Sequence, residues 1–235
     1  MMSVLERRER ERVEVRELIL DAARELFVEL GYEGVSMRKV AQRIDYSPTA
    51  IYLHFADKEA LFHELCRQDF GQLAAAFLKL SAIADPAERL AACGHAYVEF
   101  AVAHPNHYRL MFMTPVNLPM TESEKERRGN PDEDAYAFVR SIVAECMQAG
   151  LFGPELTDAD LIAQTLWAGV HGVAALEITS CKGGWTDWCS LEDRIDFMLR
   201  SLLHGMVRHE DRAGHNPSKG TTDTARAAAR SRKVK

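Results

Sequence analysis

The chain lacks the features that define several other classes of protein. No stretch approaches the roughly 18 consecutive apolar residues of a membrane span. Residues 1–16 are charged and contain no apolar segment of the kind found in a secretory signal. The five cysteines are dispersed and odd in number, and none has C-x-x-C spacing. These absences predict a cytoplasmic protein with free thiols and no membrane partner.

Motifs of the common enzyme classes are also missing. The chain has no G-x-S-x-G elbow, P-loop, dinucleotide fingerprint or H-E-x-x-H motif. It also lacks the paired Glu-x-x-His sites of catalytic helical bundles. Two histidine pairs, His104 with His107 and His204 with His209, have no Cys or carboxylate at metal-ligand spacing. We therefore expect no enzyme, no cofactor and no metal site, with metal sensing the less favoured alternative.

The charge of the chain is acidic overall but basic in two places. A net charge of −6 over 235 residues argues against a general nucleic-acid coat protein. Residues 36–58 nevertheless carry a local surplus of +2, which suits a few phosphate contacts: Arg38, Lys39, Arg43 and Lys58 against Asp45 and Asp57. Residues 213–235 form a basic tail of low complexity, which predicts disorder.

Helical caps recur along the chain and period-two alternation is absent, so the sequence predicts an all-α fold. The first helix should end at Gly31 and bury Leu18, Ile19, Ala22, Leu26, Phe27 and Leu30. Further helices are predicted from Lys58 to about Leu80 and over 86–103, 105–113, 132–150, 158–179 and 191–210. His104 should cap the helix at 105–113, while Thr157 with Asp160, and Ser190 with Asp193, have the form of capping boxes. Residues 114–131 contain three prolines and are predicted to be a loop.

Residues 36–55 have the pattern of two short helices joined by a tight turn. Ser36 is a good N-cap, and the first helix has an apolar stripe formed by Met37, Val40, Ala41 and Ile44. Asp45 tolerates the left-handed backbone of a turn. Ser47 caps the second helix, and Pro48 suits its first position. Ile51 and Phe55 anchor this helix, so the segment predicts a helix-turn-helix whose second helix can enter a major groove.

Together with its flanks, this segment resembles the N-terminal domain of the TetR (tetracycline repressor) family of bacterial transcription regulators. The resemblance runs from about Val13 to Leu65 and includes ILDAARELFVELGYEGVSMRKVA and YSPTAIYLHFADKEALF. The chain departs from the family pattern at Asp45, where Gly is usual, and at the Ser-Pro-Thr start of the second helix. The resemblance implies a three-helix DNA-binding domain at 13–65 and a larger helical ligand-binding and dimerisation domain at 66–212, followed by the tail.

The candidate DNA contacts lie on and beside the second helix of the motif. Ser47, Thr49, Ala50 and His54 are predicted to face outward toward base edges. Arg38, Tyr52 and Lys58 are predicted to contact phosphates. Ser36 and Pro48, at the two helix starts, complete the predicted surface. The alternative is a three-helix packing unit with no role in DNA binding.

The candidate ligand site lies in the C-terminal half. LWAGVHGVAALE (166–177), together with HPNHYRLMF (104–112), resembles one TetR subgroup with a Trp-x-x-x-His-Gly motif, here Trp167, His171 and Gly172. Trp167 and His171 share a helix face, where they either line a cavity or belong to the core. Further candidates are Cys93, Tyr97, Phe100, His107, Tyr108, Met111, Phe112, Cys146 and Met147. This composition predicts an apolar or aromatic small molecule.

The resemblance implies a homodimer formed through the last two long helices. The stripe Ile195, Met198, Leu199, Leu202, Leu203 and Met206 could supply the apolar face. We expect a repressor that a ligand releases from a pseudo-palindromic DNA operator by population shift, transmitted along the helix that starts at Lys58. Two rival interpretations stay open: a nonspecific architectural protein that binds DNA through the tail, and a small-molecule binding module with a vestigial DNA domain.

Overall fold

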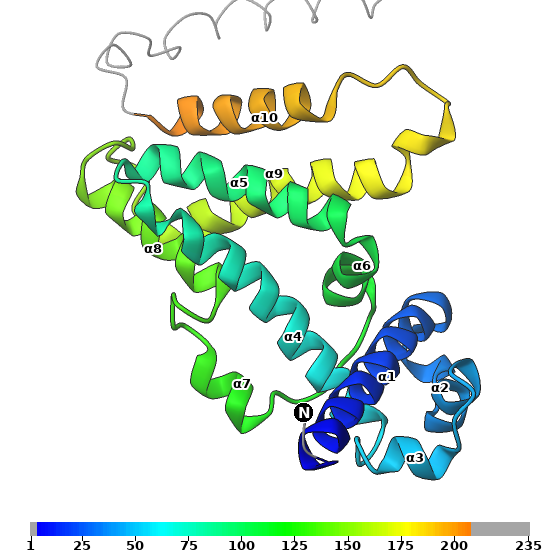
Figure 1. Cartoon of the computed structure of the whole chain (residues 1–235). Helices are drawn as coiled ribbons and strands as arrows, with labels where there is room; N and C mark the ends of the chain where they lie inside the picture. Colours follow the sequence, from blue (N-terminus) through cyan, green and yellow to red (C-terminus); the bar gives the residue numbers. More distant parts are fainter. Residues whose placement is uncertain (1–3, 208–235) are drawn as a thin grey trace, which may run out of the picture.

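The computed structural model describes residues 4–207, which fold as helices without a named strand (Figure 1). The helices are α1 (Val4–Gly34), α2 (Met37–Arg43), α3 (Pro48–Tyr52), α4 (Lys58–Leu78), α5 (Pro86–Ala103), α6 (Pro105–Met113), α7 (Glu122–Arg127), α8 (Ala135–Gln148), α9 (Ala159–Thr179) and α10 (Leu191–Met206). Two 3-10 turns, η1 (Lys79–Ala82) and η2 (Cys181–Gly183), follow α4 and α9. The basic tail and His209 lie outside the described residues.

The N-terminal unit consists of α1, α2, α3 and the first half of α4. Its local signals are confirmed: the side chains of Ser36, Ser47 and Asp57 each accept a hydrogen bond from a backbone amide three residues ahead. Asp45 adopts a left-handed backbone with φ 56° in the turn. The core of the unit is formed by apolar side chains from all four helices, including Phe27, Val40, Ile51 and Leu61.

The inward face of α1 differs from the prediction at two positions. Leu18 and Leu30 are exposed, while the face that packs on the core includes Leu20 and Ala23. Leu18 lies off the face that these residues share with Ile19 and Phe27. At the other end of the helix, the ring of Tyr32 stacks on Phe27 and covers the core beyond Leu30. Gly31 kinks the helix with φ 70°, yet the helix continues to Gly34.

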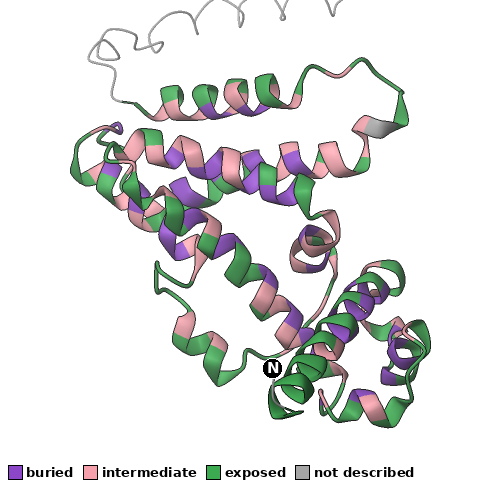
Figure 2. Cartoon of the chain, viewed as in Figure 1, coloured by how far each residue is buried: buried purple, intermediate pink, exposed green. Residues whose placement is uncertain are grey.

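The C-terminal unit packs α5, α8, α9 and α10 against one another and against the second half of α4. The predicted dimer stripe on α10 faces this core, so its assignment to the dimer face was wrong. Ile195 and Leu199 are buried, and Leu199 packs directly against Gly94 of α5. The buried and half-buried residues of α10 lie on its side toward α5 and α9, whereas the opposite side is exposed (Figure 2).

Three predictions in the connecting segments need correction. The segment 114–131 contains α7, which begins with a capping box between Thr121 and Glu124. The prolines around this short helix obscured that signal. Asp158, not Thr157, caps α9, because its carboxylate accepts hydrogen bonds from the backbone amides of Asp160 and Leu161. The side chain of His104 makes no capping hydrogen bond to α6.

The two cores are connected through α4 and α6. Leu61 and Leu65 of α4 belong to the N-terminal core, whereas Leu73 and Phe77 of the same helix belong to the C-terminal core. Leu110 of α6 also lies in the N-terminal core. Because α4 passes continuously through residue 65, the backbone marks no break at the predicted domain boundary, which stays a prediction.

One described helix, α9, is long and apolar enough to cross a membrane by length and composition. One side of α9 packs against α5, α8 and α10, and the buried residues Leu166 and Val170 belong to the C-terminal core. The same helix carries both predicted ligand residues, Trp167 and His171. Its apolar character is therefore accounted for in part by packing within the protein.

Candidate DNA-binding surface and candidate ligand site

The short helix α3 is held on the N-terminal unit by its apolar side and left free on the other. Ile51 is fully buried, and Phe55 continues the anchor just after the helix. Ser47 Oγ accepts from the Ala50 amide at 3.2 Å, which fixes the start of the helix. Thr49 and Tyr52 are exposed, and 54% of Tyr52 is accessible. This arrangement presents a helix face to an external partner.

The structure brings together most of the residues predicted to contact DNA. Ser36, Arg38, Ser47, Pro48, Thr49 and Tyr52 are exposed on α2, α3 and their caps. Ala50 and His54 are half-buried, so they are less accessible than the other predicted residues, and their contact with base edges stays a prediction. His54 lies beside α1, and its pKa is lowered first by burial and then by the positive charges of Arg12 and Arg16. A neutral, partly covered imidazole is therefore favoured there.

Two exposed residues of this surface were missed by the sequence analysis. Leu53 is 75% exposed directly after α3, and Tyr46 is exposed in the turn before it. Both are apolar or aromatic in a motif where such residues are usually read as core. A helical projection of α3 that gave Ile51 and Phe55 the inward direction could have placed Leu53 outside.

Most cations of the motif are already engaged within the protein. Lys39 Nζ donates to the Gly34 carbonyl at 2.6 Å, and Arg43 pairs with Glu29 at 2.7 Å. Lys58 Nζ donates to the Tyr32 carbonyl at 3.0 Å and lies 4.1 Å from the centre of the Tyr32 ring. Its predicted role at a phosphate therefore competes with a role at the end of α1. Arg38 is exposed and has no ion pair among the described residues.

An aromatic cluster occupies the place predicted for the ligand site. It joins Tyr97 of α5, Tyr108 and Phe112 of α6, and Trp167 and His171 of α9. Trp167 Nε1 donates to the Tyr97 hydroxyl at 3.2 Å. The hydroxyls of Tyr97 and Tyr108 each lie 3.0 Å from His171 Nδ1, and the Tyr108 hydroxyl also donates to the His171 carbonyl at 3.2 Å. Three helices are thus connected through one imidazole.

Burial sets the protonation states in this cluster. Desolvation lowers the pKa of His171 and raises the pKa of Tyr108 to about 12, so a neutral ring and a protonated hydroxyl are favoured. The pKa of Tyr97 is also raised by burial. The Tyr97 hydroxyl accepts from Trp167 and keeps its own proton to donate to Nδ1, so we assign the proton of His171 to Nε2. This Nε2–H has no hydrogen-bond partner among the described residues, which leaves it available as a donor to another molecule.

The remaining predicted ligand residues lie elsewhere in the C-terminal unit. Cys93, Phe100 and Cys146 are buried in its core, where burial raises the pKa of the Cys93 thiol to about 12 and that of Cys146 to about 11. Met111 and Met147 are half-buried against the same core. His107 points instead to Asp69 of α4, with Nδ1 2.9 Å from Oδ1. The set is therefore divided between the cluster and its surroundings.

Two aromatic residues beside the cluster were missed. The Phe70 ring of α4 packs edge-on against Phe112 with 5.6 Å between ring centres. Tyr136 of α8 lies 6.5 Å from the Trp167 ring, and its hydroxyl donates to Asp160 at 2.8 Å. Nothing in their local sequence distinguishes them from ordinary helix-surface aromatics. Phe70 and Trp167 are both partly exposed, so the cluster reaches the protein surface.

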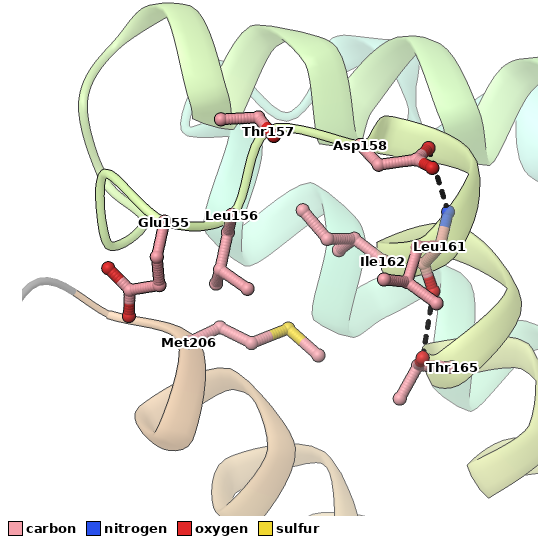
Figure 3. Close-up of a pocket in the computed structure, with 8 residues that line it drawn as sticks. All are labelled: Glu155, Leu156, Thr157, Asp158, Leu161, Ile162, Thr165 and Met206. Carbon is pink, nitrogen blue, oxygen red and sulfur yellow. Dashed lines mark hydrogen bonds between the residues drawn. The ribbon is translucent and has the colours of Figure 1, made fainter.

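A separate hollow of about 320 Å³ lies between the start of α9 and the end of α10 (Figure 3). It is mainly apolar and contains none of the predicted ligand residues. Its lining consists of Glu155, Leu156, Thr157, Asp158, Leu161, Ile162, Thr165 and Met206. Met206 extends across it from α10, and Asp158 turns away to cap α9 (Figure 3).

Comparison with known proteins supports a bacterial regulator. Residues 19–65 match the family described as "Bacterial regulatory proteins, tetR family", and residues 90–186 match "Tetracyclin repressor-like, C-terminal domain". The HTH-type transcriptional repressor Rv1474c of Mycobacterium tuberculosis is 47% identical over 60 residues, which are 26% of this chain and 32% of that protein. The matched part therefore spans about a third of that relative's length.

Solved structures extend the similarity over most of the chain. A protein of unknown function from Rhodococcus sp. RHA1 is 28% identical with a TM-score of 0.64, over 82% of this chain and 95% of that one. A TetR family transcription regulator from Marinobacter aquaeolei VT8 has a TM-score of 0.69 at 19% identity, over 86% and 100% of the two chains.

The fold and the exposed helix-turn-helix define the chain as a regulator of the helix-turn-helix class. It belongs to the TetR family of bacterial transcriptional regulators.

Proposed function

We propose that the chain is a repressor that binds a pseudo-palindromic DNA operator and is released by a small apolar or aromatic molecule. The DNA-binding part rests on the exposed face of α3, which is anchored by the buried Ile51 and presents Thr49 and Tyr52. The repressor named among the relatives supports the direction of control. Action on DNA also supports the proposed cytoplasmic location.

The proposed contacts with the operator are of two kinds, those with base edges and those with phosphates. Thr49 offers a methyl and a hydroxyl to base edges, and Tyr52 and Leu53 extend the surface that faces the groove. Arg38, which lacks an internal ion pair among the described residues, suits a phosphate. Ser36 and Ser47 lie at the same edge. Because Lys39, Arg43 and Lys58 are engaged within the protein, the motif offers few cations to phosphates, and the contacts of α3 with base edges supply the specificity.

We propose a dimer that uses the outward sides of α9 and α10. Phe197 is 71% exposed on α10, and Leu161 and Leu176 are exposed along α9. Large apolar side chains that recur on neighbouring helices are typical of a protein interface. To contact successive major grooves, such a dimer must hold its two α3 helices about 34 Å apart.

The aromatic cluster is proposed as the inducer site. Its aromatic faces suit an apolar or aromatic molecule, and the free His171 Nε2–H suits a hydrogen-bond acceptor on that molecule. A ligand that binds better when Trp167 and α6 shift would favour a second conformation and weaken DNA binding. The effect cannot exceed the difference in its affinity for the two states.

The DNA-binding part is tested with fragments selected by the purified protein from sheared genomic DNA. Fluorescence anisotropy should give tight, sequence-dependent binding that an unrelated fragment of equal length does not compete away. Equal affinity for both fragments at physiological salt would refute a specific regulator and favour binding through the tail.

The ligand part is tested with the fluorescent apolar probe 8-anilinonaphthalene-1-sulfonate. Wild-type protein should bind the probe, and the bound probe should lower its affinity for the selected DNA fragment. The combined changes Trp167→Ala and His171→Ala should remove this effect but leave DNA binding intact. Trp185→Ala, at an exposed tryptophan of the α9–α10 loop, is the matched control. An unchanged probe response in the double variant would show that Trp167 and His171 are core residues that do not bind the ligand.

A further inference from the structure

We infer that Asp69 is a positioning residue that fixes the helix-turn-helix unit on the C-terminal unit, through Arg24 on one side and His107 on the other. The inference rests on the proposed function, because it explains how the orientation of α3 is set. Nothing in the sequence pattern of the motif requires an ionic group at this place. The three residues come from α4, α1 and α6, the helices that meet between the two cores.

The carboxylate of Asp69 is completely buried and paired. It has no exposed surface, and Arg24 of α1 is only 5% exposed. Arg24 Nε donates to Oδ2 at 3.2 Å, and Arg24 Nη2 donates to Oδ1 at 3.0 Å. The third nitrogen, Nη1, donates to Asp21 of the same helix at 2.8 Å. The guanidinium is therefore held on both sides and cannot follow a moving carboxylate freely.

His107 brings α6 to the same carboxylate. Its Nδ1 atom lies 2.9 Å from Asp69 Oδ1 but is buried without a completed hydrogen bond to any of the described residues. A buried polar nitrogen without a bond is unfavourable. A small rotation of the ring or of α6 would complete the bond, so this contact can distinguish two positions of α6.

The neighbours of His107 connect the same helix to both functional parts. Tyr108, the next residue, is bonded to His171 in the aromatic cluster. Leu110, two residues later, lies in the N-terminal core. A displacement of Tyr108 is thus transmitted over one turn of helix to Asp69 and to the unit that carries α3.

An ionic contact is suited to setting an orientation. Apolar surfaces tolerate small sliding movements, whereas a buried carboxylate that loses its partner is left uncompensated. Movement of α1 away from α4 would separate Asp69 from Arg24. The buried carboxylate would then lack a partner, which raises the free energy of the folded chain. The junction therefore favours one angle between the two units over neighbouring angles.

The test uses the spacing of operator half-sites, since spacing reports the separation of the two α3 helices in a dimer. The palindrome recovered by genomic selection is prepared with its natural spacer and with one base pair added or removed. Wild-type protein should strongly prefer the natural spacing. Asp69→Asn and, separately, His107→Gln should reduce that preference by about tenfold or more, with weaker binding to the natural site.

Arg67→Gln is the matched control, because Arg67 is exposed on α4 and pairs with Glu64 of the same helix. It should retain the wild-type spacing preference. General destabilisation would lower binding to all three DNAs equally, and the milder His107→Gln serves if Asp69→Asn does not fold. A wild-type spacing profile in His107→Gln, or in a folded Asp69→Asn, would overturn the inference. Absence of any specific site for wild-type protein would instead refute the proposed function.

Discussion

At the scale of single residues, exposure and pairing separate the side chains that are free for DNA from those that hold the fold. Arg38 and Tyr52 are exposed, whereas Lys39, Arg43 and Lys58 donate to groups of the N-terminal unit. The sequence places all four cations in one short segment. Only the folded chain distinguishes them, because their partners Glu29 and Tyr32 lie on α1.

Arg38→Ala and Tyr52→Ala test this distinction. Each should weaken binding to the selected operator by about tenfold or more, since a good contact contributes about 1–3 kcal/mol. Neither should change the melting temperature, because both side chains are exposed. Lys79→Ala, on the exposed turn after α4, is the control. Operator affinities equal to wild type in both variants would remove α2 and α3 from the interface.

The neutral histidines predict a pH dependence of stability. Burial lowers the pKa of His171 and of His54 in the folded chain. The unfolded chain takes up these protons near pH 6.5, about the ordinary histidine pKa. Their contribution is therefore present above this value and is lost as the pH falls through it toward the folded-state pKa. Urea unfolding between about pH 5 and pH 8 should show lower stability at the acid end.

His171→Phe should make this pH profile shallower, because it removes one of the two titrating groups. His104→Gln, at an exposed position before α6, is the control. The comparison uses the slope and not the absolute stability, since His171 also makes hydrogen bonds. Identical slopes for wild type and His171→Phe would contradict a neutral buried imidazole.

At the scale of helices, the caps could be predicted from the sequence because their physics is local. Ser36, Ser47 and Asp85 each accept from amides two or three residues ahead, and α5 and α6 begin and end where predicted. The direction of a helix face was harder to predict. The α10 stripe was assigned to a partner chain, whereas it packs on α5 and α9 of the same chain. An apolar stripe specifies burial but not the covering surface.

The contact between α5 and α10 is tested by replacing Gly94 with alanine and comparing the effect with the same replacement at Gly71. A Cβ at Gly94 would lie 2.7 Å from Leu199 Cδ2, so Gly94→Ala should destabilise the fold by about 1–3 kcal/mol. A Cβ at Gly71 of α4 would meet nothing within 4 Å. Gly71→Ala should stabilise the fold by about 0.5–1 kcal/mol through helix propensity. Urea unfolding measures both, and equal effects at the two sites would refute the close packing.

At the scale of the whole molecule, α4 joins the two cores, as predicted for the helix that starts at Lys58, whereas the second connection through α6 was not predicted. The aromatic cluster could be predicted in part, since Tyr97, Tyr108, Phe112, Trp167 and His171 meet there. The pairing of Asp69 with Arg24 could not, because these residues are 45 positions apart and belong to no motif. Long-range ionic contacts leave no local pattern in one sequence.

The outward sides of α9 and α10 predict how the dimer can be broken. Phe197→Glu should place a charge at the proposed interface and convert the dimer to a folded monomer, as measured by sedimentation velocity. Operator affinity should fall because one α3 contacts only one half-site. Val13→Glu, at an exposed position of α1, is the control. A Phe197→Glu protein that remains dimeric would place the interface elsewhere.

Sequence-specific DNA binding through α3 is best tested by footprinting on the selected genomic fragments. We expect a short protected palindrome with two half-sites about one helical turn apart. That protection should disappear in Tyr52→Ala. Uniform, salt-sensitive retention of all fragments without a footprint would show that α3 does not confer specificity and would favour nonspecific binding through residues 213–235.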